Sequence, residues 1–229
     1  MKRRIYKYYP PQWGREAILR RRLKLTTLAD INDPFEFRAI GTKDKSLRRK
    51  LEDWRKDLPA SLGFVSFCEN RTNPVIWSHY AEGYCGICLG FDVDDSYLYS
   101  VRYVTERVIM SEEEFVAALA DRSSEEISSL LATKFAHWEY ESEKRVFYAL
   151  DEDDVVQDNG RYFAPFGQMF SLREIILGPN YEPVGDISHK KELRRAVSGL
   201  KGCSVKTART AFQTFDIVFQ QDRKKHKSF

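Results

Sequence analysis

The sequence predicts an α+β fold, a single domain over residues 1–229 in which helices flank a mixed, mainly antiparallel, split β-sheet. Its 229 residues, of which 42% are apolar, suffice for one sizeable core. Stretches typical of strands and of helices mix without the regular strand-helix-strand rhythm of a parallel sheet. The chain also has no GxGxxG and no GxxxxGK(S/T) segment, which disfavours a doubly wound dinucleotide fold and a P-loop ATPase.

The first elements follow from alternation and from turn residues. Residues 6–9 predict a short strand that two prolines end, and residues 14–22 predict a helix with an apolar stripe. Residues 23–28 alternate like a half-buried strand, and residues 30–36 are dense in turn formers.

The middle of the chain alternates helices with apolar strands. A charged helix begins at Ser46, because apolar residues then recur at helical spacing. Residues 63–68 predict a strand, residues 75–82 a short buried helix, and residues 85–92 a central strand.

A helical insert is expected at about residues 111–137. Ser111 with Glu114 and Ser123 with Glu126 have the spacing of capping boxes, which predicts helices near 112–121 and 124–137. A strand over about 140–150 then leaves the insert.

The C-terminal part predicts three strands and one helix. A strand over 173–177 ends at Gly178-Pro179, and Ser188 caps the following helix. Terminal strands are expected around 204–207 and 212–219.

Charge and cysteine content limit the class of protein. With 37 basic and 34 acidic residues the net charge is only +3, so whole-molecule charge does not argue for nucleic-acid or membrane binding, although local basic clusters occur. No apolar stretch has the length of a signal peptide or a membrane span, so we expect a cytoplasmic protein whose four cysteines are thiols.

Metal catalysis is not expected. Cys85 and Cys88 have the CxxC spacing, but no second cysteine pair completes a zinc site, and the run around them looks like a strand. The four histidines include no HExxH spacing. We therefore expect no metal and treat both thiols as core residues.

The densest chemical signal lies at residues 138–145. If this segment is extended, alternate residues share a face, so Glu139, Glu141, Glu143 and Arg145 line up together. Carboxylates crowded in this way occur either on a solvated strand edge or in a site that uses a perturbed pKa. The flanking aromatic residues favour a half-buried strand beside a cleft.

Two further segments carry candidate residues. Asn32-Asp33-Pro34-Phe35-Glu36 combines a carboxylate, a fixed backbone angle and an aromatic anchor, which fits a plain turn or the rim of a site equally well. In Trp77-Ser78-His79-Tyr80 the histidine fits a structural role or that of an acid or base.

These motifs occur together, in order, in one protein family. The chain resembles the prokaryotic domain-of-unknown-function family 2971 over residues 5 to about 180. The motifs that carry the resemblance are Tyr6-Lys7-Tyr8, Asn32-Asp33-Pro34-Phe35-Glu36, Ser66-Phe67-Cys68, Trp77-Ser78-His79-Tyr80-Ala81, Gly86-Ile87-Cys88-Leu89-Gly90-Phe91 and Trp138-x-Tyr140-Glu141-x-Glu143-x-Arg145.

More distantly, the order of these elements is similar to that of ADP-ribosyltransferases, which transfer ADP-ribose from NAD. The resemblance implies an ADP-ribosyltransferase-like fold with Tyr6 or Lys7 at the first-strand position, Ser66 at the middle position and Glu143 at the late position. Two departures are that no histidine or arginine occupies the first-strand motif and that Ser66-Phe67-Cys68 replaces a serine-threonine-serine run.

The resemblance implies catalytic roles for three residues. Glu143 would stabilise the positive charge that develops as the nicotinamide–ribose bond breaks, Glu141 would position or deprotonate the acceptor, and Arg145 or Lys7 would hold the diphosphate. The residues expected to contact NAD are Tyr6, Lys7, Tyr8, Asn32, Asp33, Phe35, Ser66, His79 and Tyr80.

The function that the resemblance implies is that of an NAD-dependent ADP-ribosyltransferase-like enzyme, of the kind found among toxins and phage-defence effectors. Its acceptor would be a nucleic acid or a protein, it would pair with an antitoxin or partner protein, and it would not bind a membrane. The alternative is a non-catalytic module that senses a ligand or binds a protein or nucleic acid, in which the same motifs are core residues.

Overall fold

The computed structural model describes residues 1–31, 33–57, 61–121, 125–183 and 187–229. Its helices are α1 (Pro11–Arg20), α2 (Lys45–Asp57), α3 (Pro74–Tyr80), α4 (Glu112–Ala120), α5 (Glu125–Leu131) and α6 (Ile187–Ser198). Its strands are β1 (Lys2–Tyr9), β2 (Arg22–Leu25), β3 (Leu62–Cys68), β4 (Ile87–Asp94), β5 (Tyr99–Ser100), β6 (Arg102–Val104), β7 (Thr133–Phe135), β8 (Glu143–Ala149), β9 (Val156–Asp158), β10 (Arg161–Pro165), β11 (Ser171–Leu177), β12 (Ser204–Thr210) and β13 (Ile217–Phe219).

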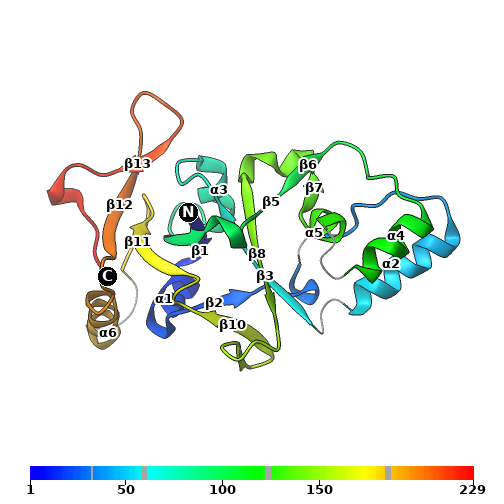
Figure 1. The fold of residues 1–229 in the computed structure, drawn as a ribbon. Helices are drawn as coiled ribbons and strands as arrows, with labels where there is room; N and C mark the ends of the chain where they lie inside the picture. The colour runs from blue at the N-terminus through cyan, green and yellow to red at the C-terminus, as the bar shows by residue number, and fades with distance from the viewer. Residues whose placement is uncertain (32, 58–60, 122–124, 184–186) are drawn as a thin grey trace.

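The fold is α+β, with a mixed and mainly antiparallel sheet of eight strands in the order β13-β12-β11-β4-β1-β3-β8-β5 (Figure 1). Within this sheet only β11 and β12 are parallel. Smaller sheets join β2, β10 and β9, and β6 with β7. The predicted α+β class and mainly antiparallel sheet are therefore confirmed.

The large sheet forks beside β3. Strand β3 pairs with β8 from Leu62 to Cys68, but with β1 at one position, Tyr6 opposite Cys68. At its other end, Phe64 of β3 forms a bridge with Thr26, which follows β2. Between Phe64 and Cys68, one edge of β3 therefore faces a gap that separates β1 from the end of β2.

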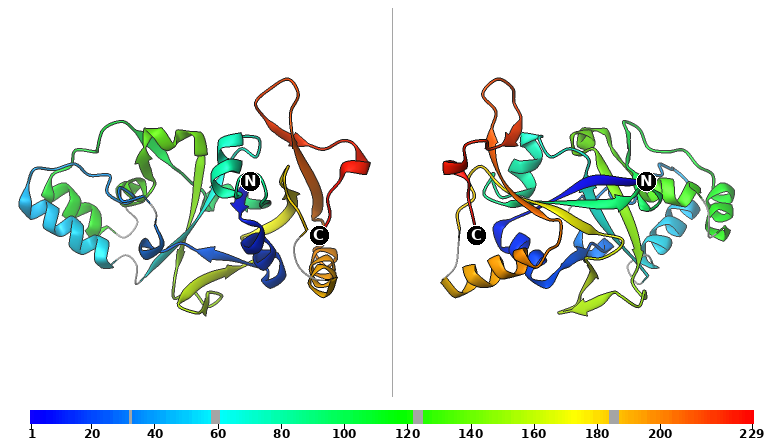
Figure 2. Two further views of the ribbon diagram at one scale, coloured as in Figure 1. Left: turned by 180° about the vertical axis from the view of Figure 1, so that it is seen from behind. Right: turned by 60° about the vertical axis from the view of Figure 1, so that its left-hand side comes forward.

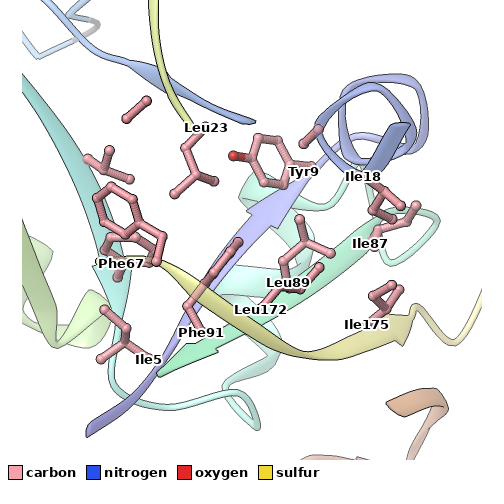
Figure 3. Packing of buried hydrophobic residues seen from close by; sticks show 14 of the residues in the cluster. Ile5, Tyr9, Ile18, Leu23, Phe67, Ile87, Leu89, Phe91, Leu172 and Ile175 are labelled. Atoms are coloured by element: carbon pink, nitrogen blue, oxygen red, sulfur yellow. The ribbon is translucent and has the colours of Figure 1, made fainter. Parts of the chain in front are cut away.

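Alternation along the strands creates two apolar layers on the large sheet. On one face, Ile5 and Tyr9 of β1 join residues of α1, β2, β4 and β11 in the main core, whose labelled members converge in Figure 3. On the other face, Tyr8 packs edge-on against Trp77 of α3 with ring centroids 5.1 Å apart. The sheet is thus covered on both sides.

A separate apolar cluster forms at one end of the molecule. Helices α2, α4 and α5 meet there around Leu47, Phe115 and Leu130, at the opposite end from α6 and β12 in Figures 1 and 2. The expected insert at 111–137 is helical only to Leu131, because the next residues pair as β7 with β6. Ser123, the expected second cap, lies outside the described residues.

The strand expected from residue 140 begins at Glu143. Residues 136–141 form a 3-10 helix that ends where Ser142 adopts a left-handed conformation, φ 43°. The prediction that Glu139 and Glu141 extend the strand face is therefore wrong, and only Glu143 and Arg145 share it. The hairpin of β9 and β10 was also not expected, whereas β12 extends to Thr210 and β13 begins only at Ile217.

The four cysteines are free thiols, and Cys88 is buried within β4. None of the helices in the described part of the chain is long and apolar enough to cross a membrane.

Close backbone packing around Gly86 yields a stability prediction. A Cβ at this position would lie 2.1 Å from the carbonyl oxygen of Tyr9 and 2.7 Å from Cα of Ala81, so neither neighbour moves without shifting the backbone. We expect Gly86→Ala to lower the free energy of unfolding by about 2 kcal/mol or more. Gly167→Ala is the control, because nothing lies within 4 Å of its Cβ. Equal urea midpoints for the two variants would contradict this packing.

Candidate functional site

A cavity of about 250 Å³ occupies the fork along β3. Eight of the residues predicted to form a site line it, namely Tyr6, Lys7, Tyr8, Asp33, Ser66, Tyr80, Glu141 and Glu143. They come from β1, the turn after β2, β3, α3, the 3-10 helix at 136–141 and β8. The fold thus brings residues that lie between positions 6 and 143 of the sequence together around one cavity.

Pairing between β3 and β8 fixes the centre of the cavity wall. Ser66 lies opposite Arg145 and Cys68 opposite Glu143, so all four side chains project from one face. The hydroxyl of Ser66 donates to Oε1 of Glu143 at 2.5 Å across the diagonal of this pair. On the β1 side, Nζ of Lys7 donates to the carbonyl oxygen of Ser66 at 3.1 Å.

Arg145 is the buried cation that holds the carboxylates. Its side chain has no exposed surface, and its guanidinium donates to Glu143 Oε1 at 2.9 Å, Glu36 Oε1 at 2.6 Å and the carbonyl oxygen of Leu131 at 2.5 Å. Burial opposes its charge, but the attraction of Glu143 and Glu36 outweighs burial, so the pKa of Arg145 is raised. Arg145 therefore does not line the cavity and acts by positioning Glu143.

Lys134 is the second cation of the network. Its Nζ lies 2.6 Å from Oε2 of Glu141 and 3.3 Å from Oε2 of Glu143, and 4.6 Å from the ring centroid of Trp138. Burial alone would lower its pKa, but Glu143 and Glu141 raise it. The ammonium therefore ties the carboxylate of the 3-10 helix to the carboxylate of the strand.

Glu143 is ionised despite its burial. Burial raises the pKa of this carboxyl, but Arg145 and Lys134 outweigh that effect and lower it to about 2. Glu36 behaves differently, because burial outweighs the attraction of Arg145 and raises its pKa. With all groups charged, Glu36, Glu141 and Glu143 against Lys134 and Arg145 leave one net negative charge in this network.

The two central carboxylates differ in their free acceptor positions. Glu143 accepts four bonds, one from Ser66, one from Lys134 and two from Arg145, which matches the roughly four lone-pair positions of a carboxylate. Glu141 accepts from the hydroxyl of Tyr80 and from Lys134 only, among the contacts of the described residues. Its carboxylate thus retains about two positions for a ligand.

Several predicted residues do not reach the cavity wall. Phe35 is 60% exposed and contacts Arg107 outside it. His79 is exposed on α3, where its Nδ1 lies 3.3 Å from the hydroxyl of Tyr140. Asn32 lies outside the described residues. Tyr8 does line the wall, but its hydroxyl donates to the carbonyl oxygen of Asn70.

The structure adds Lys134 to the wall, a residue within the helix that the sequence predicts over 124–137. Glu36 and Trp138 belong to the sequence motifs without an expected contact to NAD, and both also line the cavity. In the described ranges, no cluster of three or more histidine, cysteine, aspartate or glutamate side chains is arranged to hold a metal ion.

The opposite pKa shifts of Glu143 and Glu36 predict the acid stability. A lowered pKa stabilises the fold above the ordinary carboxyl range, so the contribution of Glu143, about 3 kcal/mol, is lost as the pH falls from about 4.5 towards 2. Glu36 has a raised pKa and contributes no such loss. Urea unfolding of wild type between pH 5 and pH 3 should show falling stability, and Glu143→Gln should flatten this slope whereas Glu36→Gln should not. An equally steep slope in Glu143→Gln would contradict the assignment.

Comparison with known proteins supplies no relative from which to transfer a function. No protein-family model matches the chain, and no curated protein or solved structure is significantly similar to it. The chemistry of the cavity is therefore the basis for assigning a function.

Proposed function

We propose that the chain is an ADP-ribosyltransferase-like enzyme that breaks the nicotinamide–ribose bond of NAD and transfers ADP-ribose to an acceptor. One observation carries this proposal. The cavity joins Tyr6 and Lys7 of β1, Ser66 of β3 and Glu143 of β8 with Glu141 beside them. These are the positions for which the sequence resemblance implies NAD contacts and group transfer.

The charge of the cavity wall suits the bond that has to break. When the C–N bond of NAD breaks, its electron pair leaves with neutral nicotinamide, and the ribose becomes oxocarbenium-like and positive. An ionised Glu143 offers a fixed negative charge beside that centre, and it needs no reorganisation because Arg145 and Ser66 already hold it. The three carboxylates of Glu36, Glu141 and Glu143 exceed the two cations, Lys134 and Arg145, by one negative charge.

Glu141 supports the second half of the reaction. An acceptor hydroxyl or amine that attacks the ribose carbon must lose a proton as the new bond forms. The free acceptor positions of Glu141 suit this proton, and Tyr80 and Lys134 hold the carboxylate in place at the cavity wall. Glu141 is thus the proposed base that accepts the proton of the acceptor.

The remaining wall residues suit the rest of NAD. The aromatic rings of Tyr6 and Trp138 line the cavity and offer surfaces for the nicotinamide ring. The ammonium of Lys7 lies at the edge of the cavity, where a diphosphate would meet a cation. A toxin or defence effector that modifies nucleic acid or protein is the biological setting that the sequence resemblances suggest.

One observation favours a second candidate, the non-catalytic ligand-sensing or interaction module. Glu143 already accepts four bonds, as expected of a purely structural carboxylate. Against it, Glu141 and Glu143 are buried beside Tyr6 in one cavity, whereas an interaction surface would expose them. Turnover distinguishes the two candidates.

The test of the proposal is nicotinamide release from NAD by the purified protein, with and without cell extract. Glu143→Gln should lower the rate about 100-fold or more, because it removes the negative charge beside the developing cation. Glu141→Gln should lower transfer to the acceptor about 100-fold while hydrolysis of NAD falls less. Glu139→Gln is the matched control, since Glu139 is exposed on the same 3-10 helix.

The assay separates the candidates if NAD binding is measured alongside it. Calorimetric binding of NAD without nicotinamide release would assign the sensing module instead. Absence of both binding and release with every extract would overturn the enzyme. Thermal melts of each variant show whether a loss of rate is a loss of fold.

A further inference from the structure

A second and larger cavity adjoins the first. It has a volume of about 640 Å³, within the range of roughly 300–1,000 Å³ in which proteins bind small ligands. It lies between α1, β2 and the β9–β10 hairpin, which are neighbours in Figure 1. Both cavities are lined by Lys7, Tyr8 and Thr26, so they lie side by side at these three residues.

The two cavities have opposite charge. The first has five acidic residues and two lysines in its wall. The second, the basic cavity, is lined by five basic residues and two acidic ones, which are Lys7, Arg20, Arg22, Lys24, Arg161, Glu16 and Asp158. An anionic group is therefore repelled by the first wall and attracted by the second.

Arg22 forms the floor of the basic cavity. Its guanidinium stacks on the ring of Phe163 at 3.7 Å and pairs with Asp158 at 2.6 Å and with Glu16 at 3.3 Å. Arg22, whose side chain is 11% exposed, balances one of these two negative charges, and Arg20, which also pairs with Glu16, balances the second. The acidic residues of the wall leave little charge to oppose an incoming anion.

The rim of the basic cavity has cations with spare capacity. Arg20 is 59% exposed, and its one ion pair with the residues that the structure describes is to Glu16, at 3.3 Å. Arg161 is exposed, and within the described residues it forms no ion pair. Both guanidiniums can therefore turn their donors to a phosphate.

Lys7 marks the junction of the two cavities. Its ammonium has three donors, and the described residues offer it one hydrogen bond, to the carbonyl oxygen of Ser66. None of the described carboxylates is in hydrogen-bond contact with this ammonium, and burial lowers its pKa to about 8. An anion at this junction would restore the missing interaction.

Trp13 supplies a flat apolar surface at the same cavity. Its side chain lies on α1 and is 47% exposed, although it lines the basic cavity. An exposed indole beside arginines is the combination on which nucleotide bases stack while their phosphates are bound.

We propose that the basic cavity binds a nucleotide, with its phosphates on Arg20, Arg161 and Lys7 and its base on Trp13. Two sources share this chemistry, the adenylate half of NAD and a nucleotide of a nucleic-acid acceptor. The identity of these sources rests on the proposed function, whereas the nucleotide site itself does not. Phosphates then lie outside the acidic cavity and the reacting ribose lies inside it.

The test titrates ADP and a fluorescent single-stranded 12-mer, as DNA and as RNA, into the full chain. Arg20→Gln/Arg161→Gln should weaken binding about tenfold or more, because each arginine donates charged hydrogen bonds. Trp13→Ala should weaken it about fivefold or more through lost stacking. Lys45→Gln/Arg49→Gln is the charge-matched control, because both side chains are exposed on α2 at the other end of the molecule.

Each outcome either identifies the ligand of the basic cavity or overturns the proposed nucleotide site. Binding of ADP alone that these variants weaken assigns the adenylate half of NAD. Binding of the 12-mer, with a salt dependence that becomes shallower by about 0.7 for each lost phosphate contact, assigns an acceptor strand. Failure of both ligands to bind, or equal loss in the α2 control, overturns the proposal.

The experiments can reject the proposed function and the proposed nucleotide site independently of each other. Nicotinamide release by a protein in which the basic-cavity variants weaken the binding of neither ADP nor the 12-mer would retain the enzyme and reject the site. Nucleotide binding that depends on Arg161 and Trp13, without nicotinamide release, would retain the site and reject the enzyme.

Discussion

The fork beside β3 is the constraint on which the rest of the site depends. A strand can pair with one neighbour on each side, and β3 uses the whole of one side for β8. On the other side it meets β1 at Cys68 and the residue after β2 at Phe64, so the middle of β3 has no continuous partner. The ammonium of Lys7 binds the carbonyl oxygen of Ser66 in this gap, and the cavity opens around it.

The network around Arg145 is costly if its only purpose is stability. Burying three carboxylates and two cations requires desolvation that ion pairing only partly offsets, and well-packed apolar residues often do as well or better. What such a network provides is a fixed field with one excess negative charge at a cavity wall. Because the adjoining cavity is basic, the fold keeps opposite charges on two sides of Lys7. A ligand with a cationic and an anionic part suits this separation.

The sequence predicts what depends on local pattern and misses what depends on distant contacts. Alternation located β1, β3 and β8 to within a few residues, and the Ser111–Glu114 capping box located α4. The hairpin of β9 and β10 carried a local signal that was not used, since Asn159-Gly160 is a typical two-residue turn with both φ angles positive. No local pattern could pair Arg145 with Glu36, which lies 109 residues away. The start of β8 was missed because tertiary contacts of residues 136–141 outweigh their extended pattern.

Occupancy of the cavity has to change the Lys134 contact first. A ribose hydroxyl that binds Glu143 needs one of its four acceptor positions, and these are not equally held. Ser66 and Nε of Arg145 bind at 2.5 and 2.9 Å, whereas Lys134 and Nη2 of Arg145 each bind at 3.3 Å. Of these two long contacts, only that of Lys134 comes from a residue that lines the cavity, and Lys134 has a shorter bond of 2.6 Å to Glu141. Lys134 can therefore release Glu143 and remain paired. The saturated carboxylate that favours a structural role would thus become available to a ligand at the expense of one of its two long contacts. The same movement would leave Lys134 on Glu141, next to the position where an acceptor would lose its proton.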